Sequence, residues 1–326
     1  MPIGDHPFPS PIGGIPFPHD FAPALLFTIL YAIVVPVGIY RLISKRSRTL
    51  AIAGTVVFMI ERVADFAIRA AEAEKPSIRT GVFFVSWLQS AYAMGFLSIT
   101  GDLGNIARLF VMKTTEGTPF TVQIPPAECA PRMEEEQPLT TPMDPFRDAS
   151  SSYSQVPTAE EDVFEDEPRI RVWLKRIGLA CILVRILAIG TAVVSGGAFY
   201  MGVVSVVQAN IVQQTRYASS IIVLFLQMLA LGEVVWALLT RPKRTPRRPA
   251  LYLCAMISVI MVTTVYRLAA MMSFTTSLTS MGPGSLNGPT AKALFYTFHV
   301  APEWVSSTML LVVNVRDMYG VNGKGH

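Results

Sequence analysis

Seven long apolar blocks, separated by polar connections, set the pattern of the chain. They run approximately over residues 21–43, 49–71, 81–112, 173–201, 217–239, 250–273 and 290–314. A helix needs about 20 mainly apolar residues to cross a bilayer, and alternating patterns of the β-barrel kind are not evident. The pattern therefore predicts an all-α, polytopic membrane protein built as a seven-transmembrane-helix bundle.

Domain boundaries follow the polar segments between these blocks. Residues 1–20, rich in Pro and Gly, predict a disordered extracellular tail, and residues 315–326 predict a short cytosolic tail. Helices 1–3 then occupy residues 21–112, and helices 4–7 occupy residues 171–314. Residues 113–170 carry 13 acidic and 4 basic residues, a composition typical of disorder. This acidic cytosolic loop is either a flexible connection with no fixed partner or a segment that binds a cytosolic protein.

Basic residues flank the predicted helices unevenly. The connection after the first helix holds Lys45, Arg46 and Arg48, and the connection after the fifth, RPKRTPRRP, holds five basic residues. Basic residues in short loops favour the cytosolic side of a membrane. With seven helices, both connections share one side with the C-terminus. We therefore expect the N-terminus outside and the C-terminus in the cytosol.

Composition narrows the function classes. Hydrophobic residues make up 51% of the chain and charged residues 15%, whereas a soluble domain carries about 25% charged residues. One short basic loop does not support nucleic-acid binding. The three cysteines lie far apart, and only one histidine lies in a predicted helix. The sequence therefore predicts no disulfide framework, metal site, cofactor or catalytic site, and no enzyme activity.

Charged residues inside the predicted helices are the candidate functional residues. A charge near the bilayer centre costs about 3 kcal/mol unless it finds a partner or water. The candidates for a cavity lining or a charge cluster are Glu61, Arg62, Asp65, Arg185, Glu233, Arg267, His299 and Glu303. Their depths along the helices lead us to expect that Glu61, Arg185 and Glu303 converge. Either the charges form structural pairs that lock the bundle, or they line a water-filled or amphiphile-binding cavity.

The last helix combines a histidine, a proline and an acid in one apolar stretch. His299 and Glu303 are four residues apart, so a helix places both on one face. Pro302 lacks an N–H group, so the carbonyl of Phe298 loses its helical partner and a kink is expected. An unperturbed histidine titrates near neutrality. His299 and Glu303 are therefore a candidate proton-responsive pair in the cavity interpretation.

Short motifs in the last two helices match a known pattern. The motifs Tyr-x-Phe-acid-x-x-Pro and Tyr-Arg are matched by Tyr296, Phe298, Pro302, Tyr266 and Arg267, with His299 at the acidic position. In these motifs the chain resembles the fungal lipid-translocating exporter family, seven-helix proteins associated with resistance to aminocholesterol and similar amphiphiles, or a related uncharacterised fungal seven-helix family. The resemblance implies a plasma-membrane protein that exports or responds to amphiphilic lipids, without a defined catalytic site.

Three function hypotheses follow. The leading one is a non-enzymatic integral membrane protein that transports or senses an amphiphilic small molecule or a membrane lipid. One alternative is a seven-helix receptor that signals to the cytosol, although the last helix lacks an Asn-Pro-x-x-Tyr motif. The other is a membrane assembly or adaptor protein that uses the loop at 113–170 as its contact surface.

Overall fold

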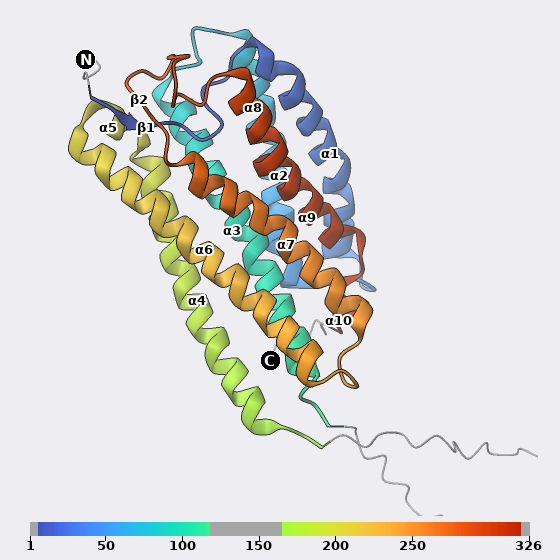
Figure 1. Ribbon diagram of the computed structural model, residues 1–326. Coiled ribbons are helices and arrows are strands. Elements are labelled where there is room, and N and C mark those ends of the chain that lie inside the picture. Colours follow the sequence, from blue (N-terminus) through green and yellow to red (C-terminus); the bar gives the residue numbers. More distant parts are fainter. Residues whose placement is uncertain (1–5, 118–164, 321–326) are drawn as a thin grey trace, which may run out of the picture.

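The protein is almost entirely helical in the structure, a computed structural model that describes residues 6–117 and 165–320. Five helices in these ranges are long and apolar enough to cross a membrane. They are α1 (Phe21–Ile43), α3 (Val82–Lys113), α4 (Pro168–Gly197), α6 (Val206–Thr240) and α7 (Arg247–Ala270), and they run along the long axis of the molecule (Figure 1). The all-helical prediction is confirmed, and the five apolar helices fit an integral membrane protein. The count of seven spans stays a prediction.

Two further helical segments pack among these five. α2 (Ala53–Glu74) packs against α1 and α3. The last segment consists of α8 (Pro289–Phe295), a π-helical turn (Tyr296–Val300) and α9 (Ala301–Val312), and α9 packs against α1, α3 and α7. Both segments carry charged residues, and several of them are buried: Arg62, Asp65, Arg69, Lys292 and Glu303. These charges must therefore find partners inside the protein.

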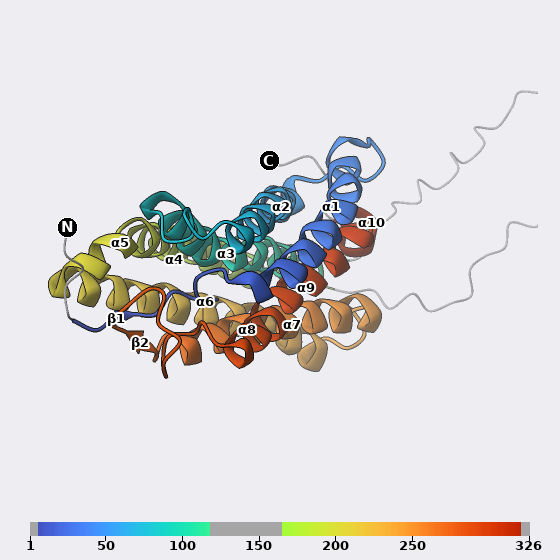
Figure 2. The same cartoon turned by 90° about the horizontal axis from the view of Figure 1, so that it is seen from above.

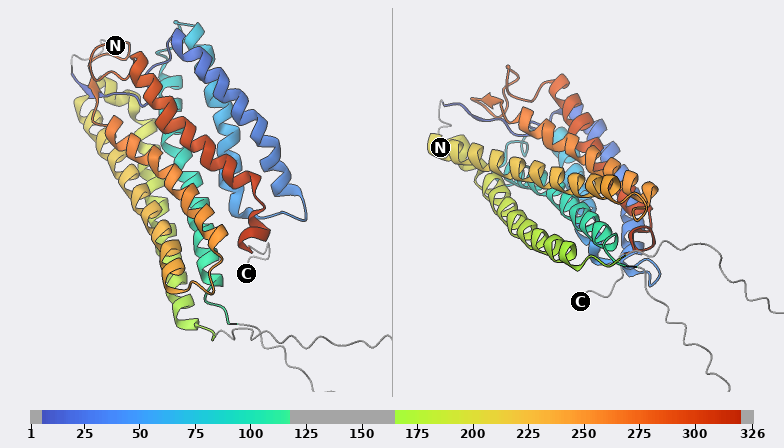
Figure 3. Two further views of the ribbon diagram at one scale, coloured as in Figure 1. Left: turned by 45° about the vertical axis from the view of Figure 1, so that its right-hand side comes forward. Right: turned by 60° about the horizontal axis from the view of Figure 1, so that its bottom comes forward.

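Short elements lie at the two ends of the bundle. They are β1 (Phe8–Pro9), which pairs antiparallel with β2 (Phe274–Thr275), η1 (Pro18–Asp20), η2 (Leu50–Ile52), α5 (Phe199–Val204) and α10 (Val315–Tyr319). The two strands and α5 lie at one end, and α10 and the α6–α7 connection lie at the other (Figure 3). α6 begins at Val206, so residues 208–216, which belong to the polar connection expected between the apolar blocks 173–201 and 217–239, are helical, and Arg216 is buried.

The last helical segment widens immediately before Pro302. Over Tyr296–Val300 the backbone is π-helical, and the N–H of Ala301 bonds the carbonyl of Tyr296. A π-helical turn is one of the recognised irregularities of a helix, and the kink expected from Pro302 itself stays a prediction. The carbonyl of His299 within this turn accepts a hydrogen bond from Thr263 Oγ1 of α7 at 3.1 Å. α7 therefore contacts the backbone of the turn directly.

The N-terminal segment is the largest departure from expectation. Residues 8–16 are buried one after another, and the segment crosses the end of the bundle before it enters α1 (Figure 2). We call residues 8–20 the N-terminal plug. The disordered tail predicted for residues 1–20 is therefore wrong for these residues, while residues 1–5 lie outside the described part of the chain.

Side chains from distant helices hold the backbone of the plug. Gln89 of α3 accepts from Ile12 N at 2.9 Å and donates to Ile12 O at 3.2 Å. Asn287 Oδ1 accepts from Ile15 N at 2.8 Å, and Arg216 of α6 donates to Ser10 O at 3.1 Å. Buried backbone groups need such partners. A Pro- and Gly-rich chain cannot supply them from a helix of its own, so the bundle supplies them instead.

Gly14 is required where the plug turns. Its φ is +59°, and an added Cβ would lie 2.4 Å from the carbonyl oxygen of Leu286. We expect Gly14→Ala to lower the free energy of unfolding by about 2 kcal/mol, because left-handed backbone costs an L-residue roughly 1–2 kcal/mol before any clash. Denaturation of the purified protein in detergent measures this. Gly190→Ala is the control, since Gly190 has open space around it; equal losses in both variants would contradict the prediction.

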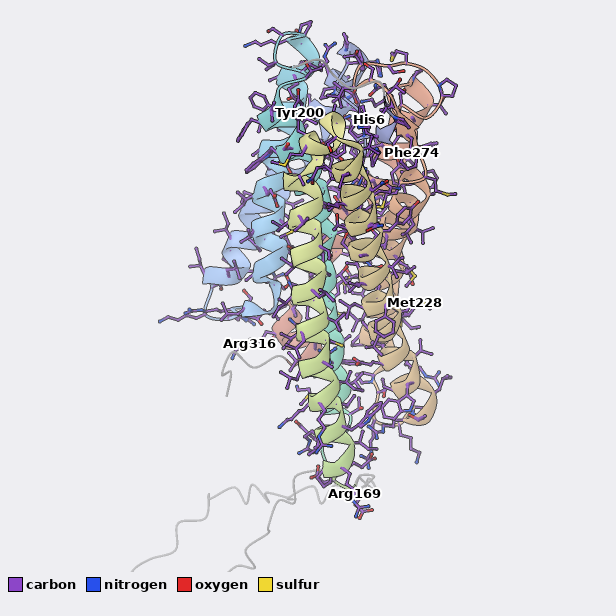
Figure 4. All side chains as sticks on the ribbon, turned by 90° about the vertical axis from the view of Figure 1, so that its left-hand side faces the viewer. His6, Arg169, Tyr200, Met228, Phe274 and Arg316 are labelled. Carbon is purple, nitrogen blue, oxygen red and sulfur yellow. The ribbon has the colours of Figure 1, made fainter. Side chains whose placement is uncertain are left out.

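At the end of the bundle opposite the plug, the two segments that flank the acidic loop lie together. Glu167 N donates to Thr115 O at 3.1 Å, and the Glu167 carboxylate pairs with Arg241 and Arg244 of the α6–α7 connection. Arg169 and Arg316 lie towards this end, whereas His6, Tyr200 and Phe274 lie at the plug end (Figure 4). Most of the loop predicted at 113–170, residues 118–164, lies outside the described part of the chain.

Candidate functional site

A buried ion-pair network joins α2 to α9. Arg62 Nε donates to Glu303 Oε2 at 3.1 Å, and Arg62 Nη2 donates to Glu303 Oε1 at 3.2 Å. Arg62 Nη1 also bonds Asp65 Oδ2 at 3.0 Å, while Trp87 Nε1 donates to Asp65 Oδ1 at 2.9 Å. The side chains of Arg62, Asp65 and Glu303 have no exposed surface. One guanidinium thus bonds two carboxylates. Its contact with Glu303 is two-pronged, which is the strong form of this interaction.

Aromatic rings close the network to water. The guanidinium of Arg62 lies 4.7 Å from the centroid of the Phe58 ring and 5.2 Å from that of Tyr92. A cation over an aromatic face is stabilised further when it is desolvated. The network is therefore a buried, water-excluded contact that holds the second helical segment to the last one. This agrees with the interpretation of these charges as structural pairs.

The predicted convergence of Glu61, Arg185 and Glu303 does not occur. Glu303 pairs with Arg62, the residue directly after Glu61, and Glu61 itself is half-buried. Consecutive residues point about 100° apart around a helix, so depth alone could not select between Glu61 and Arg62. Arg185 lies on α4, and α4 packs against α3 and α6.

His299 lies beside the network without bonding to it. Its Nε2 atom is 3.9 Å from Glu303 Oε1, and neither ring nitrogen has a hydrogen-bond partner in the described residues. The imidazole is fully buried among the rings of Tyr92, Tyr266 and Phe295, with centroid distances of 5.9, 6.1 and 5.2 Å. The structure brings His299 and Glu303 to one face as predicted, but at a distance beyond hydrogen bonding.

Arg267 is also buried in this region, with 1% of its surface exposed. It donates to the carbonyl of Tyr92 at 2.5 Å, and its guanidinium lies 4.7 Å from the centroid of the Phe96 ring. Within the described ranges it forms no ion pair, and its Nε has no hydrogen-bond partner. Arg267 is therefore a buried cation whose charge no carboxylate neutralises directly.

A second network seats the plug. Asp20 Oδ1 pairs with Arg69 Nη2 at 3.0 Å, and Asp20 Oδ2 pairs with Lys292 Nζ at 2.8 Å. Tyr296 bridges the two sides, because its hydroxyl accepts from Arg69 Nε at 3.0 Å and donates to Asp20 Oδ1 at 3.2 Å. Arg69 and Lys292 also donate to the carbonyl of Gly13 in the plug, at 2.5 and 2.7 Å. Asp20 and Lys292 were not among the predicted candidates because both stand at the ends of apolar blocks, where solvated charges are common.

A surface pocket lies between α3, α4 and α6, on a different side of α3 from the buried networks. Its lining is Thr100, Gly101, Gly104, Asn105, Arg108, Cys181, Ile182, Arg185 and Leu226. Glu233 borders this region, because its carboxylate lies 3.7 Å from Arg108 Nε. Two of the predicted candidates, Arg185 and Glu233, thus belong to this pocket region and not to the buried network.

Arg185 lies flat against the backbone of α3. A Cβ added at Gly101 would lie 1.9 Å from Arg185 Cζ, so only glycine admits the guanidinium there. Arg185 makes no ion pair with any described residue, and its buried Nε has no partner. The nearest acid on α3, Asp102, is already bonded to Thr55 N and Oγ1 at 2.6 and 2.9 Å. The pocket therefore presents one unpaired guanidinium beside a second, Arg108, whose charge is shared with Glu233.

In residues 6–117 and 165–320, no three His, Cys, Asp or Glu side chains come together in a group that could hold a metal ion. Comparisons of the chain with protein-family models, with characterised proteins and with solved structures find no match.

Proposed function

We propose that this chain is a seven-helix integral membrane protein, with its N-terminus outside and its C-terminus in the cytosol. It binds an amphiphile or lipid with an acidic head group in the pocket between α3, α4 and α6, and it transports or senses that molecule without enzymatic chemistry. The unpaired Arg185 guanidinium in this pocket is the observation that carries the proposal.

The count of seven is supported by the way two less apolar segments keep their charges inside. α2 is less apolar than the five long helices because it carries residues such as Arg62, Asp65 and Arg69, all of which are fully buried. Charges that are paired in the protein interior do not contact lipid. They therefore do not add the free-energy cost of exposing a charge to the bilayer, and α2 can lie in the membrane. α9 behaves in the same way through Glu303.

The orientation is supported by the distribution of basic residues. The described residues at the end opposite the plug include Lys45, Arg46, Arg48, Arg169, Arg171, Lys175, Arg176, Arg241, Lys243, Arg244, Arg247, Arg248 and Arg316. The α2–α3 connection at the plug end carries Lys75 and Arg79 next to Glu74. This asymmetry favours the basic end as cytosolic.

The pocket fits an amphiphile because it combines cationic and apolar parts. Ile182 lines it, and the neighbouring α4 residues Leu183 and Ile186 are 61% and 59% exposed, as expected for a helix face towards lipid. An arginine on such a face costs a few kcal/mol unless an anion accompanies it. A carboxylate or phosphate head group would accompany Arg185, while its chain lay against the apolar face of α4. The resemblance of the last two helices to lipid-translocating exporters agrees with a lipid ligand and a plasma-membrane location.

Binding of a fluorescent fatty acid to the purified full-length protein in non-ionic detergent tests this function. We expect Arg185→Gln to weaken binding about tenfold, which corresponds to about 1.4 kcal/mol. Gly101→Ala should act in the same direction, because the added methyl group displaces the guanidinium. Arg176→Gln, which removes an exposed arginine from the same helix, is the matched control.

A neutral ligand distinguishes recognition of the acidic head group from nonspecific adsorption of the hydrocarbon chain to the protein. A fluorescent fatty alcohol of equal chain length should bind the wild type and Arg185→Gln alike. The proposal fails if the wild type does not distinguish acid from alcohol, or if Arg185→Gln and Arg176→Gln retain the same affinity. Flux of the acid into proteoliposomes then distinguishes transport from sensing.

A further inference from the structure

Two buried arginines near the plug end lack carboxylate partners. Arg216 of α6 is 3% exposed and Arg267 of α7 is 1% exposed. Arg216 Nη1 donates to Ser10 O at 3.1 Å, and Arg267 Nη1 donates to Tyr92 O at 2.5 Å. Among the described residues, neither forms an ion pair, although Arg62, Arg69 and Lys292 each have one. A backbone carbonyl satisfies one N–H group, but it leaves the charge unneutralised.

Each of the two arginines also keeps a buried N–H group without an acceptor. These groups are Arg216 Nη2 and Arg267 Nε. Buried donors without partners are rare in native proteins, and each costs about 1–3 kcal/mol. Arg216 is a neighbouring positive charge of Arg267, so the two repel each other. Among the described residues, Glu303 also acts on Arg267, but Glu303 is already held by Arg62.

Contacts between α6 and α7 place Arg216 and Arg267 at neighbouring positions of one seam. Gln213 Nε2 donates to Met271 O at 2.6 Å, and Ser220 Oγ lies 3.9 Å from Met271 Sδ. Arg216 lies between Gln213 and Ser220 on the same helix face, and Arg267 precedes Met271 by one turn. The plug covers this seam through Ser10. The site is therefore enclosed by α6, α7 and the plug.

We propose that a small monovalent anion with the chemistry of chloride binds between Arg216 and Arg267 beneath the plug. The anion accepts from the two free N–H groups and offsets the repulsion between the guanidinium groups. Its size is limited because both side chains are buried and neither lines the pocket between α3, α4 and α6. The ring centroids of Phe199 and Phe96 lie 5.7 and 4.7 Å from the respective guanidinium carbons, so aromatic rings already cover one side of each cation. This proposal does not depend on the function proposed above.

Thermal unfolding of the full chain in non-ionic detergent, with sodium chloride replaced by sodium gluconate at constant ionic strength, tests the site. We expect chloride to raise Tm in a saturable manner, because it binds the folded state alone. The shift should be lost in Arg216→Gln and Arg267→Gln. Arg79→Gln is the matched control, since Arg79 is a buried arginine at the same end that bonds the carbonyls of Glu72 and Ala73.

Chloride NMR line broadening on the wild type gives a second readout that needs no variant. Broadening by the protein should be reversed by bromide and not by gluconate. The proposal is overturned if wild-type Tm does not depend on the anion and no bromide-reversible broadening occurs. It is equally overturned if folded Arg216→Gln and Arg267→Gln keep the full chloride shift.

Discussion

Glu303→Gln is expected to lower the free energy of unfolding by about 3–5 kcal/mol. This is the usual cost of removing one partner from a buried ion pair, because the remaining charge stays in a low-dielectric interior. Arg62 would lose its two-pronged contact with Glu303 and keep only Asp65, 3.0 Å away. Unfolding of the purified protein in mixed detergent micelles measures the change.

Glu61→Gln is the matched control for Glu303→Gln. Glu61 lies beside Arg62 on α2, but it is half-buried and makes no ion pair in the described part of the chain. We expect its substitution to change the free energy of unfolding by less than about 1 kcal/mol. Similar losses for Glu61→Gln and Glu303→Gln would show that the Arg62–Glu303 contact does not stabilise the fold.

Asp20→Asn is expected to destabilise the protein to a similar degree, by about 3–5 kcal/mol, and to release the plug. The Asp20 carboxylate is the shared partner of Arg69 and Lys292, so its loss leaves two buried cations without an acid. Ile12→Cys, in a protein whose three native cysteines are replaced by serine, should resist maleimide labelling, since Ile12 is 1% exposed. The same cysteine in the Asp20→Asn background should react rapidly.

The labelling rate separates a loosened plug from general unfolding. Asp317→Asn, at an exposed position of α10, should leave both stability and the Ile12→Cys labelling rate unchanged. If Asp20→Asn labels as slowly as the wild type, the plug is held by its backbone contacts with Gln89 and Asn287 and not by the ion pairs.

The long apolar blocks of the sequence were sufficient to predict the helices, because a chain that crosses a membrane core must be helical there. They predicted α1, α3, α4 and α7 to within a few residues, and they missed the start of α6. The polar residues between 208 and 216 suggested a link, but Arg216 among them donates to Ser10 of the plug, and Gln213 donates to Met271. The partner of Arg216 lies in a segment that the sequence shows only as Pro- and Gly-rich chain.

The candidate site was harder to predict because ion pairs depend on helix rotation and neighbour choice. The sequence identified Arg62, Asp65, His299 and Glu303 as interior residues, and the structure does place them together. It could not show that Arg62, and not Arg185, would hold Glu303. That choice depends on α2 packing near α9 while α4 packs on α3 and α6, a matter of tertiary contacts between segments far apart in the chain.

The seating of the plug has a consequence for biosynthesis. Asp20 reaches its partner Tyr296 across 276 positions of the chain, so the plug is synthesised well before the helix that completes its seating. At about 5–20 residues per second, that interval is roughly 14 to 55 s. During this time Asp20 lacks both Lys292 and Tyr296. The plug is therefore made early relative to this helix and reaches its full set of native contacts only after the helix is in place.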